Sequence, residues 1–347
     1  MPDPPALPRL AVTMGDPSGV GPEVVAAVWG HPCVWSACRP IVFGDAALLA
    51  RAATLRGLPT KCRPAGTPEE AFQIASPEVM PCVAGESLDG RAIQPGVVTA
   101  ATGEAAYQAV VAAARLALDG GCEGLVTAPL SKSALHAAGR DYPGHTELLA
   151  ELCGVDDFAM MLYLPREFAP KTRAGLGVIH TTLHTSMRGA IDALSEESIF
   201  QKCRLAHQAA IAYGVPAPRI GVAALNPHAG EGGLFGDEEQ RLIAPAVEAA
   251  RRAGVDASGP HPVDTLMGRA VEGEFDAVVA MYHDQGHIAL KLLGMHGAVN
   301  VTLGLPIVRT SVAHGTAPDK AWRGVAQTSG MLSAIDYAGR LAAHRAG

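Results

Sequence analysis

The sequence is poor in aromatic residues and has no long apolar segment. Phe, Trp and Tyr make up 5% of the 347 residues, and no run reaches the roughly 18 apolar residues that a membrane-spanning helix needs. The opening stretch, MPDPPALPRLAVTMG, also lacks the basic region and apolar segment of a signal peptide. We therefore expect a cytoplasmic protein with no membrane partner.

An excess of positive charge is also missing, and the cysteines show no pattern. The formal net charge is −7 at pH 7, which argues against nucleic acid or an anionic membrane surface as the main partner. A local cationic pocket for a small anion is compatible with this charge. The seven cysteines are odd in number and have no CxxC spacing, which indicates reduced thiols rather than a disulfide framework.

Neither common nucleotide-binding motif is present. A glycine-rich loop, GDPSGVGPE (15–23), lies between a predicted strand and a predicted helix, but its spacing is neither G-x-G-x-x-G nor Walker A. Such a loop can bind an anion through backbone N–H groups. It can equally be a tight turn before a helix that has Pro22 near its start. Both interpretations stay open.

Short β-branched runs alternate with helical patterns along most of the chain. This alternation predicts an α/β protein with largely parallel sheets. The second predicted helix has Gly214 as a candidate C-cap. The predicted strands are 10–14, 40–44, 124–129, 174–182, 219–227, 276–282 and 298–304, and the clearest helices are 102–121 and 196–214.

The length of 347 residues favours two domains over one. No repeat, low-complexity tract or linker marks a boundary between them. The segment PGVVTA (95–100) could be an exposed hairpin or a crossover. Two domains that interleave in sequence, with the chain leaving the first domain and returning late, would explain the missing linker.

Three histidines follow predicted strands: His184, His228 and His283. Loops after parallel strands gather at one edge of a sheet, where ligands bind in open α/β proteins. Three imidazoles that leave coordination positions open suit a catalytic divalent metal. His180 and His287 compete for the same role, and spacing does not exclude them.

Two acidic residues lie near these histidines in the sequence. Asp264, in GPHPVDTL, and Asp284, in MYHDQGH, could orient a metal ligand or add one.

Lys291 and Arg309 occupy otherwise apolar stretches. In each, the methylene groups of the side chain could pack on apolar residues while the charged end reaches water. Beside the small polar loops GHT (144–146) and VNVT (299–302), they could instead bind a phosphate or carboxylate.

The segment HGTAPDKAWRG (314–324) combines small residues with an acidic one. Small residues let the backbone approach a flat ring, and Asp319 could accept hydrogen bonds from a ribose diol. Its charge would repel a 2′-phosphate and so favour NAD over NADP. The composition also fits a capped loop.

Seven motifs occur in order along the chain: GDPSGVGPE, TAPLSK, GHTELL, LNPHAGEGG, GPHPVDTL, MYHDQGH and VNVTLGLPIVRTSVAHGT. Together they resemble one family, the 4-hydroxythreonine-4-phosphate dehydrogenases of pyridoxal phosphate biosynthesis and their sugar-acid-phosphate relatives. The HGTAPD loop is also similar to the adenine-side loop of the isocitrate and isopropylmalate dehydrogenases.

This resemblance implies an isocitrate/isopropylmalate dehydrogenase-like fold with an active-site cleft between two α/β domains. The first domain would contain residues 1–130 and 290–347, and the second would contain 131–289 with the metal-ligand loops and dimer contacts. The protein would be a homodimer with its active site at the subunit interface. It would use NAD and one divalent metal ion per site, either Zn²⁺, Mg²⁺ or Co²⁺.

The resemblance also implies a role for individual residues. The metal ligands, contributed from both subunits, would be His184, His228 and His283. The substrate and its phosphate would be bound by His145, Thr146, Lys291, Asn300 and Arg309. The cofactor loop would use His314, Gly315, Ala317 and Asp319. The candidates for the general base are Asp264, Asp284 and His145, and none is preferred.

The implied reaction oxidises the C3 hydroxyl of a four-carbon 4-phosphorylated acid and then removes CO₂ from the β-keto acid. The favoured substrate is 4-phosphohydroxy-L-threonine, which gives 3-amino-2-oxopropyl phosphate. The alternative is D-threonate or D-erythronate 4-phosphate, which gives dihydroxyacetone phosphate. Some segments look more like those of the relatives that act on sugar acids. They are His287, IALKLLG, IHTTLHTSMRG and GGLFGDEE.

Two rival hypotheses keep the same residues but change the function. One is a metal-dependent phosphohydrolase or isomerase without nicotinamide, against which the HGTAPD loop argues. The other is a non-catalytic protein that binds a small phosphorylated metabolite.

Overall fold

A computed structural model describes residues 6–84 and 93–346, and the chain forms two compact units. Unit 1 consists of Met1–Asp156 and Leu305–Gly347, and unit 2 consists of Asp157–Gly304. The chain therefore leaves unit 1 and returns to it late, which explains why the sequence shows no linker. No helix in the described part of the chain is long and apolar enough to cross a membrane.

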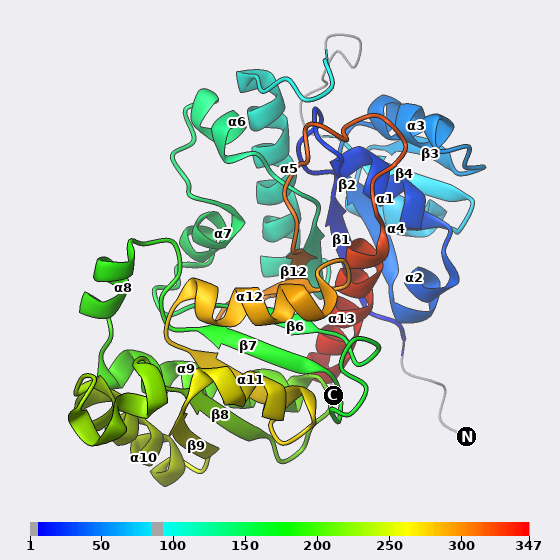
Figure 1. Ribbon diagram of the computed structural model, residues 1–347. Coiled ribbons are helices and arrows are strands. Elements are labelled where there is room, and N and C mark those ends of the chain that lie inside the picture. The colour runs from blue at the N-terminus through cyan, green and yellow to red at the C-terminus, as the bar shows by residue number, and fades with distance from the viewer. Residues whose placement is uncertain (1–5, 85–92, 347) are drawn as a thin grey trace, which may run out of the picture. The chain divides into compact units, whose positions relative to one another are not determined.

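Unit 1 is built on parallel strands (Figure 1). Their order is β3-β4-β2-β1-β5-β12. The central strands are buried almost throughout, because helices cover a parallel sheet on both faces. The strands are β1 (Arg9–Thr13), β2 (Arg39–Phe43), β3 (Lys61–Ala65), β4 (Val79–Val83), β5 (Gly124–Thr127) and β12 (Val308–Val312).

Helices of unit 1 begin at residues suited to a helix start. Asp45, Thr67 and Thr99 each accept a hydrogen bond from a first-turn N–H group, and Pro22 lies in the first turn of α1 as predicted. The helices are α1 (Gly21–Trp29), α2 (Pro32–Ala37), α3 (Ala46–Leu55), α4 (Pro68–Ile74), α5 (Ala100–Leu118), α6 (Lys132–Ala137), α7 (His145–Cys153) and α13 (Ser329–Ala346).

Unit 2 contains a mixed sheet in the order β11-β6-β7-β10-β8-β9. β6 is antiparallel to both of its neighbours, and β7, β10, β8 and β9 are parallel to one another. The strands are β6 (Ala159–Leu164), β7 (Leu176–His180), β8 (Arg219–Ala223), β9 (Asp256–His261), β10 (Ala277–Ala280) and β11 (Val299–Leu303).

In Figure 1, α11 and α12 cover the face of the unit 2 sheet that is turned toward the viewer. α9 packs on β7, β10 and β8, and α10 packs on α9 and β9. As predicted, Gly214 follows the end of α9 with a φ of 101°. The helices are α8 (Met187–Asp192), α9 (Glu196–Ala212), α10 (Ala244–Arg252), α11 (Val263–Val271) and α12 (His283–Gly294); a tight turn, η1 (Pro227–Gly233), and a π-helical turn, η2 (Glu239–Ile243), lie between β8 and α10.

The predicted α/β class with largely parallel strands is confirmed, and all seven predicted strands are present. The unit boundaries lie elsewhere than predicted. Residues 131–156, placed in the second domain from the sequence, belong to unit 1 because α6 and α7 pack against α5. Residues 290–304 belong to unit 2 because β11 pairs with β6. The segment 95–99 is a loop that leads into α5.

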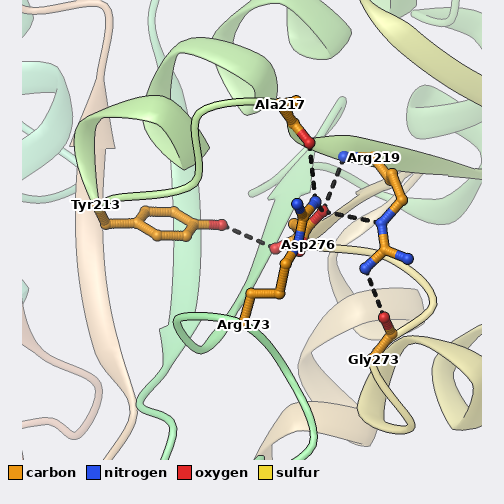
Figure 2. A network of polar contacts seen from close by, with 6 residues as sticks. All are labelled: Arg173, Tyr213, Ala217, Arg219, Gly273 and Asp276. Atoms are coloured by element: carbon orange, nitrogen blue, oxygen red, sulfur yellow. Dashed lines mark hydrogen bonds and ion pairs between the residues drawn. The ribbon is translucent and has the colours of Figure 1, made fainter.

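A buried carboxylate joins the starting ends of three unit 2 strands (Figure 2). Asp276, directly before β10, is 1% exposed. It accepts hydrogen bonds from both Nε and Nη2 of Arg173 and from the backbone N–H of Arg219 at 2.8 Å. Tyr213 donates its hydroxyl to the carbonyl of Asp276 at 2.8 Å. This network lies at the end of the sheet opposite to the strand-end histidines.

Candidate functional site

The histidines predicted to bind metal follow three adjacent parallel strands of unit 2. His184 follows β7, His283 is the first residue of α12 after β10, and His228 lies in η1 after β8. The rings of His184 and His283 have centroids 6.1 Å apart. The fold therefore brings these two imidazoles to one edge of the sheet, as the sequence predicted.

A cavity of about 640 Å³ opens at this edge. It contains both imidazoles and the Asp284 carboxylate, together with apolar groups from the start of α8. Its lining residues are Leu183, His184, Thr185, Ser186, Met187, Ala190, Tyr282, His283 and Asp284. The combination of imidazole, carboxylate and hydroxyl groups is a donor set that suits a divalent cation.

The orientation of His283 is determined by its neighbour. Nδ1 of His283 lies 2.6 Å from a carboxylate oxygen of Asp284. A ring that donates Nδ1–H to a carboxylate keeps Nε2 deprotonated and available for coordination. Asp284 therefore lies where a carboxylate can orient the ring of His283.

His228 lies on a turn with unusual backbone geometry. The φ angles of His228, Ala229 and Glu231 are 53°, 55° and 44°, all in the left-handed region. The ring of His228 contacts Phe235 at a centroid distance of 6.4 Å. Among residues 6–84 and 93–346, no three His, Cys, Asp or Glu side chains of one chain come close enough to hold a metal ion.

His180 and His287 form a buried pair behind His283. Nδ1 of His287 lies 3.0 Å from Nε2 of His180 and 3.2 Å from the carbonyl of His283. Burial lowers the pKa of His180 to about 4 and that of His287 to about 3. The rings of His180 and His287 are tilted by 44° with centroids 4.6 Å apart, and the ring of His287 stacks on that of His283 at a centroid distance of 3.8 Å.

Gln285 has a role that the sequence interpretation missed. Its side-chain oxygen accepts from the N–H of Met281 at 2.7 Å, and its amide group donates to the carbonyl of Ala224 at 2.7 Å. The side chain thus joins the end of β10 to the end of β8 directly beside His283. Its place inside the HDQGH motif was the available signal.

Unit 1 contains a buried cation. Arg309, the second residue of β12, is 2% exposed and donates to the hydroxyl of Thr127 at 2.8 Å. Burial lowers the pKa of its guanidinium to about 9, against the opposing charge of Glu147. A guanidinium buried in this way binds an anion strongly, because little water competes for it.

His145 and Thr146 begin α7, close to this cation. Burial, followed by the charge of Arg309, lowers the pKa of His145 well below its ordinary value of 6.5. The imidazole is therefore neutral near pH 7. Its Nε2 atom is buried and makes no hydrogen bond within the described segments. Both Nε2 and the guanidinium can serve a bound anion.

The remaining candidates are divided between the units. Lys291 in α12 and Asn300 in β11 belong to unit 2, and the side-chain oxygen of Asn300 is buried without a hydrogen-bond partner in the part of the chain described. Asp264, the second residue of α11, is exposed and does not line the cavity. The structure thus favours Asp284 over Asp264 as the carboxylate beside the paired imidazoles.

The predicted cofactor loop packs on the glycine-rich loop of unit 1. The N–H of Val20 donates to the carbonyl of Thr316 at 3.0 Å, and a Cβ on Gly19 would lie 2.8 Å from that of Thr316. Glu23, fully buried, accepts from the N–H groups of Trp322 and Gly324. The loop that contains His314, Gly315, Ala317 and Asp319 is thereby held against GDPSGVGPE, and Ala317 has a φ of 42°.

These features define a class of protein: an α/β chain of two interleaved units, with imidazoles at the strand ends of one unit and a buried guanidinium in the other. The family model of the pyridoxal phosphate biosynthetic protein PdxA matches residues 36–338, and the chain belongs to this family. The resemblance drawn from the seven motifs is confirmed.

Relatives with two different names match almost the whole chain. A 4-hydroxythreonine-4-phosphate dehydrogenase from Geobacter metallireducens is 47% identical, with 96% of each chain covered. A D-threonate 4-phosphate dehydrogenase from Cupriavidus necator is 44% identical, with 98% of this chain and 99% of the relative covered. A crystal structure of 4-hydroxythreonine-4-phosphate dehydrogenase from Klebsiella pneumoniae is 44% identical over 98% of this chain and 99% of that one, with a TM-score of 0.83.

Proposed function

We propose that this protein is a cytoplasmic NAD- and metal-dependent dehydrogenase that oxidises the C3 hydroxyl of a four-carbon 4-phosphorylated acid and releases CO₂. The favoured substrate is 4-phosphohydroxy-L-threonine, which gives 3-amino-2-oxopropyl phosphate. Membership of a family whose relatives are named as dehydrogenases of phosphorylated acids supports the reaction type.

The observation that carries the proposal is the buried Arg309 beside a neutral His145. A phosphate group at this position would offset the burial of the guanidinium and could accept a hydrogen bond from the imidazole. Thr146, 8% exposed at the start of α7, adds a hydroxyl close to the positive end of that helix. We assign Lys291 and Asn300 to the same substrate, as the family resemblance implies.

The metal would be held by His184 and His283, with Asp284 orienting His283. The paired imidazoles and the adjoining carboxylate fit a divalent ion. When bound, the ion supplies positive charge at the C3 hydroxyl and at the carbonyl formed from it, and NAD supplies the hydride acceptor.

A third imidazole would come from a second copy of the chain. The turn with His228 ends in two exposed apolar residues, Leu234 and Phe235, which are 72% and 49% exposed. Unit 2 also exposes apolar side chains on α12, among them Leu292 at 83%. We propose a homodimer in which His228 of one copy completes the site of the other.

Residues of the chain would bind the phosphate, bind the cofactor and accept the proton of the substrate. Arg309 and His145 hold the phosphate end, so the carbon skeleton is oriented by its most strongly charged group. The cofactor loop, His314–Asp319, rests on the glycine-rich loop and presents Asp319 to a ribose diol. Asp284, His145 or Asp264 would accept the proton of the C3 hydroxyl, and the exposed position of Asp264 makes it the weakest candidate.

D-threonate or D-erythronate 4-phosphate is the alternative substrate. It would be oxidised in the same way and would give dihydroxyacetone phosphate and CO₂. The relative from Cupriavidus necator, with 44% identity over nearly the whole chain, specifically favours this second candidate. His287, buried directly behind His283, is the first position at which to look for the difference.

NADH formation with the purified full-length protein tests the proposal. The assay contains NAD, a divalent metal and, in parallel, 4-phosphohydroxy-L-threonine, D-threonate 4-phosphate or D-erythronate 4-phosphate. We expect turnover with the amino acid and a dependence on both NAD and metal. A preference for a sugar acid would select the alternative, and no NADH with any of the three would refute the proposed reaction.

A further inference from the structure

The turn that carries His228 is held in a backbone conformation that its residues do not favour. All five residues from His228 to Gly232 have left-handed φ angles. Three of them, His228, Ala229 and Glu231, carry a Cβ atom. A left-handed run of this kind is costly for L-amino acids unless surrounding groups hold it. The structure must therefore contain the groups that stabilise it.

The side chain of Glu239 stabilises this turn. Its side chain is 3% exposed, and its Oε1 atom accepts hydrogen bonds from the backbone N–H of Leu225 at 2.8 Å and of Asn226 at 2.7 Å. Its Oε2 atom accepts from the side-chain amide of Asn226 at 3.0 Å. One buried carboxylate thus secures the segment that connects β8 to the turn.

The charge state of Glu239 suits this role. Burial raises the pKa of the Glu239 carboxyl, but the hydrogen bonds donated by Leu225 and Asn226 outweigh burial and bring the pKa below its ordinary value. The side chain is therefore an ionised acceptor at neutral pH.

Two glycines leave room for the carboxylate and its partner. A Cβ on Gly230, whose φ is 77°, would lie 2.7 Å from Oε2 of Glu239. A Cβ on Gly236, whose φ is 132°, would lie 2.5 Å from the side-chain nitrogen of Asn226. The turn therefore closes around Glu239, because only residues without a Cβ fit at these two positions.

Glu239 itself stands on a rigid support. It is the first residue of the π-helical turn η2, which continues into α10, and both η2 and α10 pack against α9. π-Helical turns are rare and often mark functional sites, since the inserted residue turns side chains to new directions. The carboxylate is thus anchored to the helical layer of unit 2 rather than to a loop.

We propose that Glu239 is a positioning residue that holds His228 ready to coordinate the metal ion of the neighbouring copy, an inference that rests on the function proposed above. The carboxylate acts through the backbone of residues 225–226 and through Gly230, and it touches neither substrate nor cofactor. Its removal releases the left-handed turn, so the imidazole of His228 must be ordered again each time the metal binds.

Titration of the metal-free, full-length protein with Co²⁺ by calorimetry tests this inference. The Glu239→Ala variant should bind Co²⁺ about 10- to 100-fold more weakly than the parent protein, as is typical when a group that orients a metal ligand is lost. The Glu239→Gln variant retains a carbonyl oxygen for both N–H groups and should recover most of the affinity. The Co²⁺ absorption spectrum gives an independent readout of the ligand geometry.

Glu238→Ala is the matched control. Glu238 precedes Glu239 and accepts from the side chain of Asn226 at 2.6 Å rather than from the backbone N–H groups that Glu239 binds, so its removal should leave Co²⁺ affinity near the parent value. Circular dichroism must show that each variant is folded.

Three outcomes would overturn the inference: parent-like affinity in Glu239→Ala, an equal loss in Glu238→Ala, or a folded Glu239→Gln that binds as weakly as Glu239→Ala. A different result would reject the proposed metal site itself, namely equal Co²⁺ binding by the parent and by His228→Ala.

Discussion

We propose that the burial of Arg309 serves substrate binding more than folding. A charged side chain inside a strand loses its hydration, and an apolar residue of similar volume at such a position often keeps or raises stability. Arg309 donates to the hydroxyl of Thr127 and interacts with the charge of Glu147. Arg309 should therefore show opposite effects on stability and on catalysis.

Replacement of Arg309 by Met tests this expectation. We expect kcat/KM for the phosphorylated substrate to fall about 10- to 100-fold, because a hydrogen bond to a charged group contributes about 1.5–3 kcal/mol. The free energy of unfolding, measured with urea, should stay the same or rise. Arg340→Met, which removes an exposed ion pair with Asp336, should leave kcat/KM unchanged. A large loss of stability with normal kinetics would show that Arg309 is structural.

His145 should make the protein less stable in acid. The unfolded imidazole takes up a proton below about pH 6.5, whereas burial and Arg309 keep the folded imidazole neutral to lower pH. Protonation then favours the unfolded chain, so stability falls with pH, by up to about 1.4 kcal/mol for each pH unit below about 6.5. Urea unfolding at several pH values should show a shallower slope for His145→Asn. His136→Asn, at an exposed position, should keep the slope of the parent protein.

The residues that the sequence did not reveal share one property. Each of them makes hydrogen bonds to groups that the fold brings close, so its role depends on the folded positions of those groups. They are Thr127, Gln285 and Glu239. Residue type and spacing place the histidines at strand ends, because strand ends gather at a sheet edge. Neither shows which backbone N–H group will face a given carboxylate.

At the scale of elements, two helix glycines have opposite roles. A Cβ on Gly103, inside α5, would lie 1.9 Å from the carbonyl oxygen of Ala134 in α6. A Cβ on Gly268, inside α11, would meet no atom within 4 Å. The first glycine permits two helices to touch, and the second only makes its helix more flexible.

The two glycine-to-alanine variants should move stability in opposite directions. Gly103→Ala forces α5 and α6 apart and should lower the free energy of unfolding by about 1–3 kcal/mol. Gly268→Ala should raise it by about 0.5–1 kcal/mol, since alanine favours the helix. Urea denaturation of both variants gives the comparison. Equal shifts in the same direction would contradict the close contact of α5 with α6.

The Asp276 network joins three strands at the end remote from the histidines (Figure 2). Asp276→Ala leaves Arg173 and Arg219 without their shared carboxylate and should lower the free energy of unfolding by about 3 kcal/mol. KM at low temperature should stay unchanged, because the change does not reach the cavity. Glu274→Ala, which breaks the exposed ion pair with Arg269, should change stability much less. A raised KM in folded Asp276→Ala would show that the two ends of the sheet are coupled.

The sequence did not predict β3, β4, β6, β9 or β12, and for β6 and β12 the reason is physical. β6, with the sequence AMMLYL, is buried at every position, so it shows no alternation that would separate a strand from a buried helix. β12, with the sequence VRTSV, carries an arginine and two hydroxyl groups into the core. These polar residues reflect the proposed anion site rather than solvent exposure. Secondary-structure prediction from local sequence patterns often fails at such functional positions.

For the whole molecule, the decisive question is whether two copies share each site. A mixture of His228→Ala and His283→Ala chains, each inactive alone, should regain activity if His228 acts on the partner's site. Random pairing makes half of the dimers mixed, and each mixed dimer has one intact site, so about a quarter of the parent activity should return. Activity after unfolding and refolding the mixture is the measurement. No recovery, with dimers present by light scattering, would place all ligands of a site on one chain.

The arrangement of the whole molecule followed only in outline from the sequence. The missing linker suggested interleaved domains, and the chain does return to unit 1. The points of departure and return depend on packing that no local pattern encodes: α7 contacts α5, and β11 pairs with β6.

The first and last residues of unit 2, Asp157 and Gly304, lie side by side. A Cβ on Gly304 would fall 2.4 Å from the carbonyl oxygen of Asp157, so unit 2 begins and ends at one place. During synthesis, unit 2 is complete once residue 304 has left the ribosome, whereas unit 1 must wait for residues 305–347. Those last residues form β12 and α13 and include Arg309. The unit that contains the His184 and His283 imidazoles can therefore fold before β12 adds Arg309 to unit 1, and a chain that ends after residue 304 lacks the proposed anion-binding guanidinium.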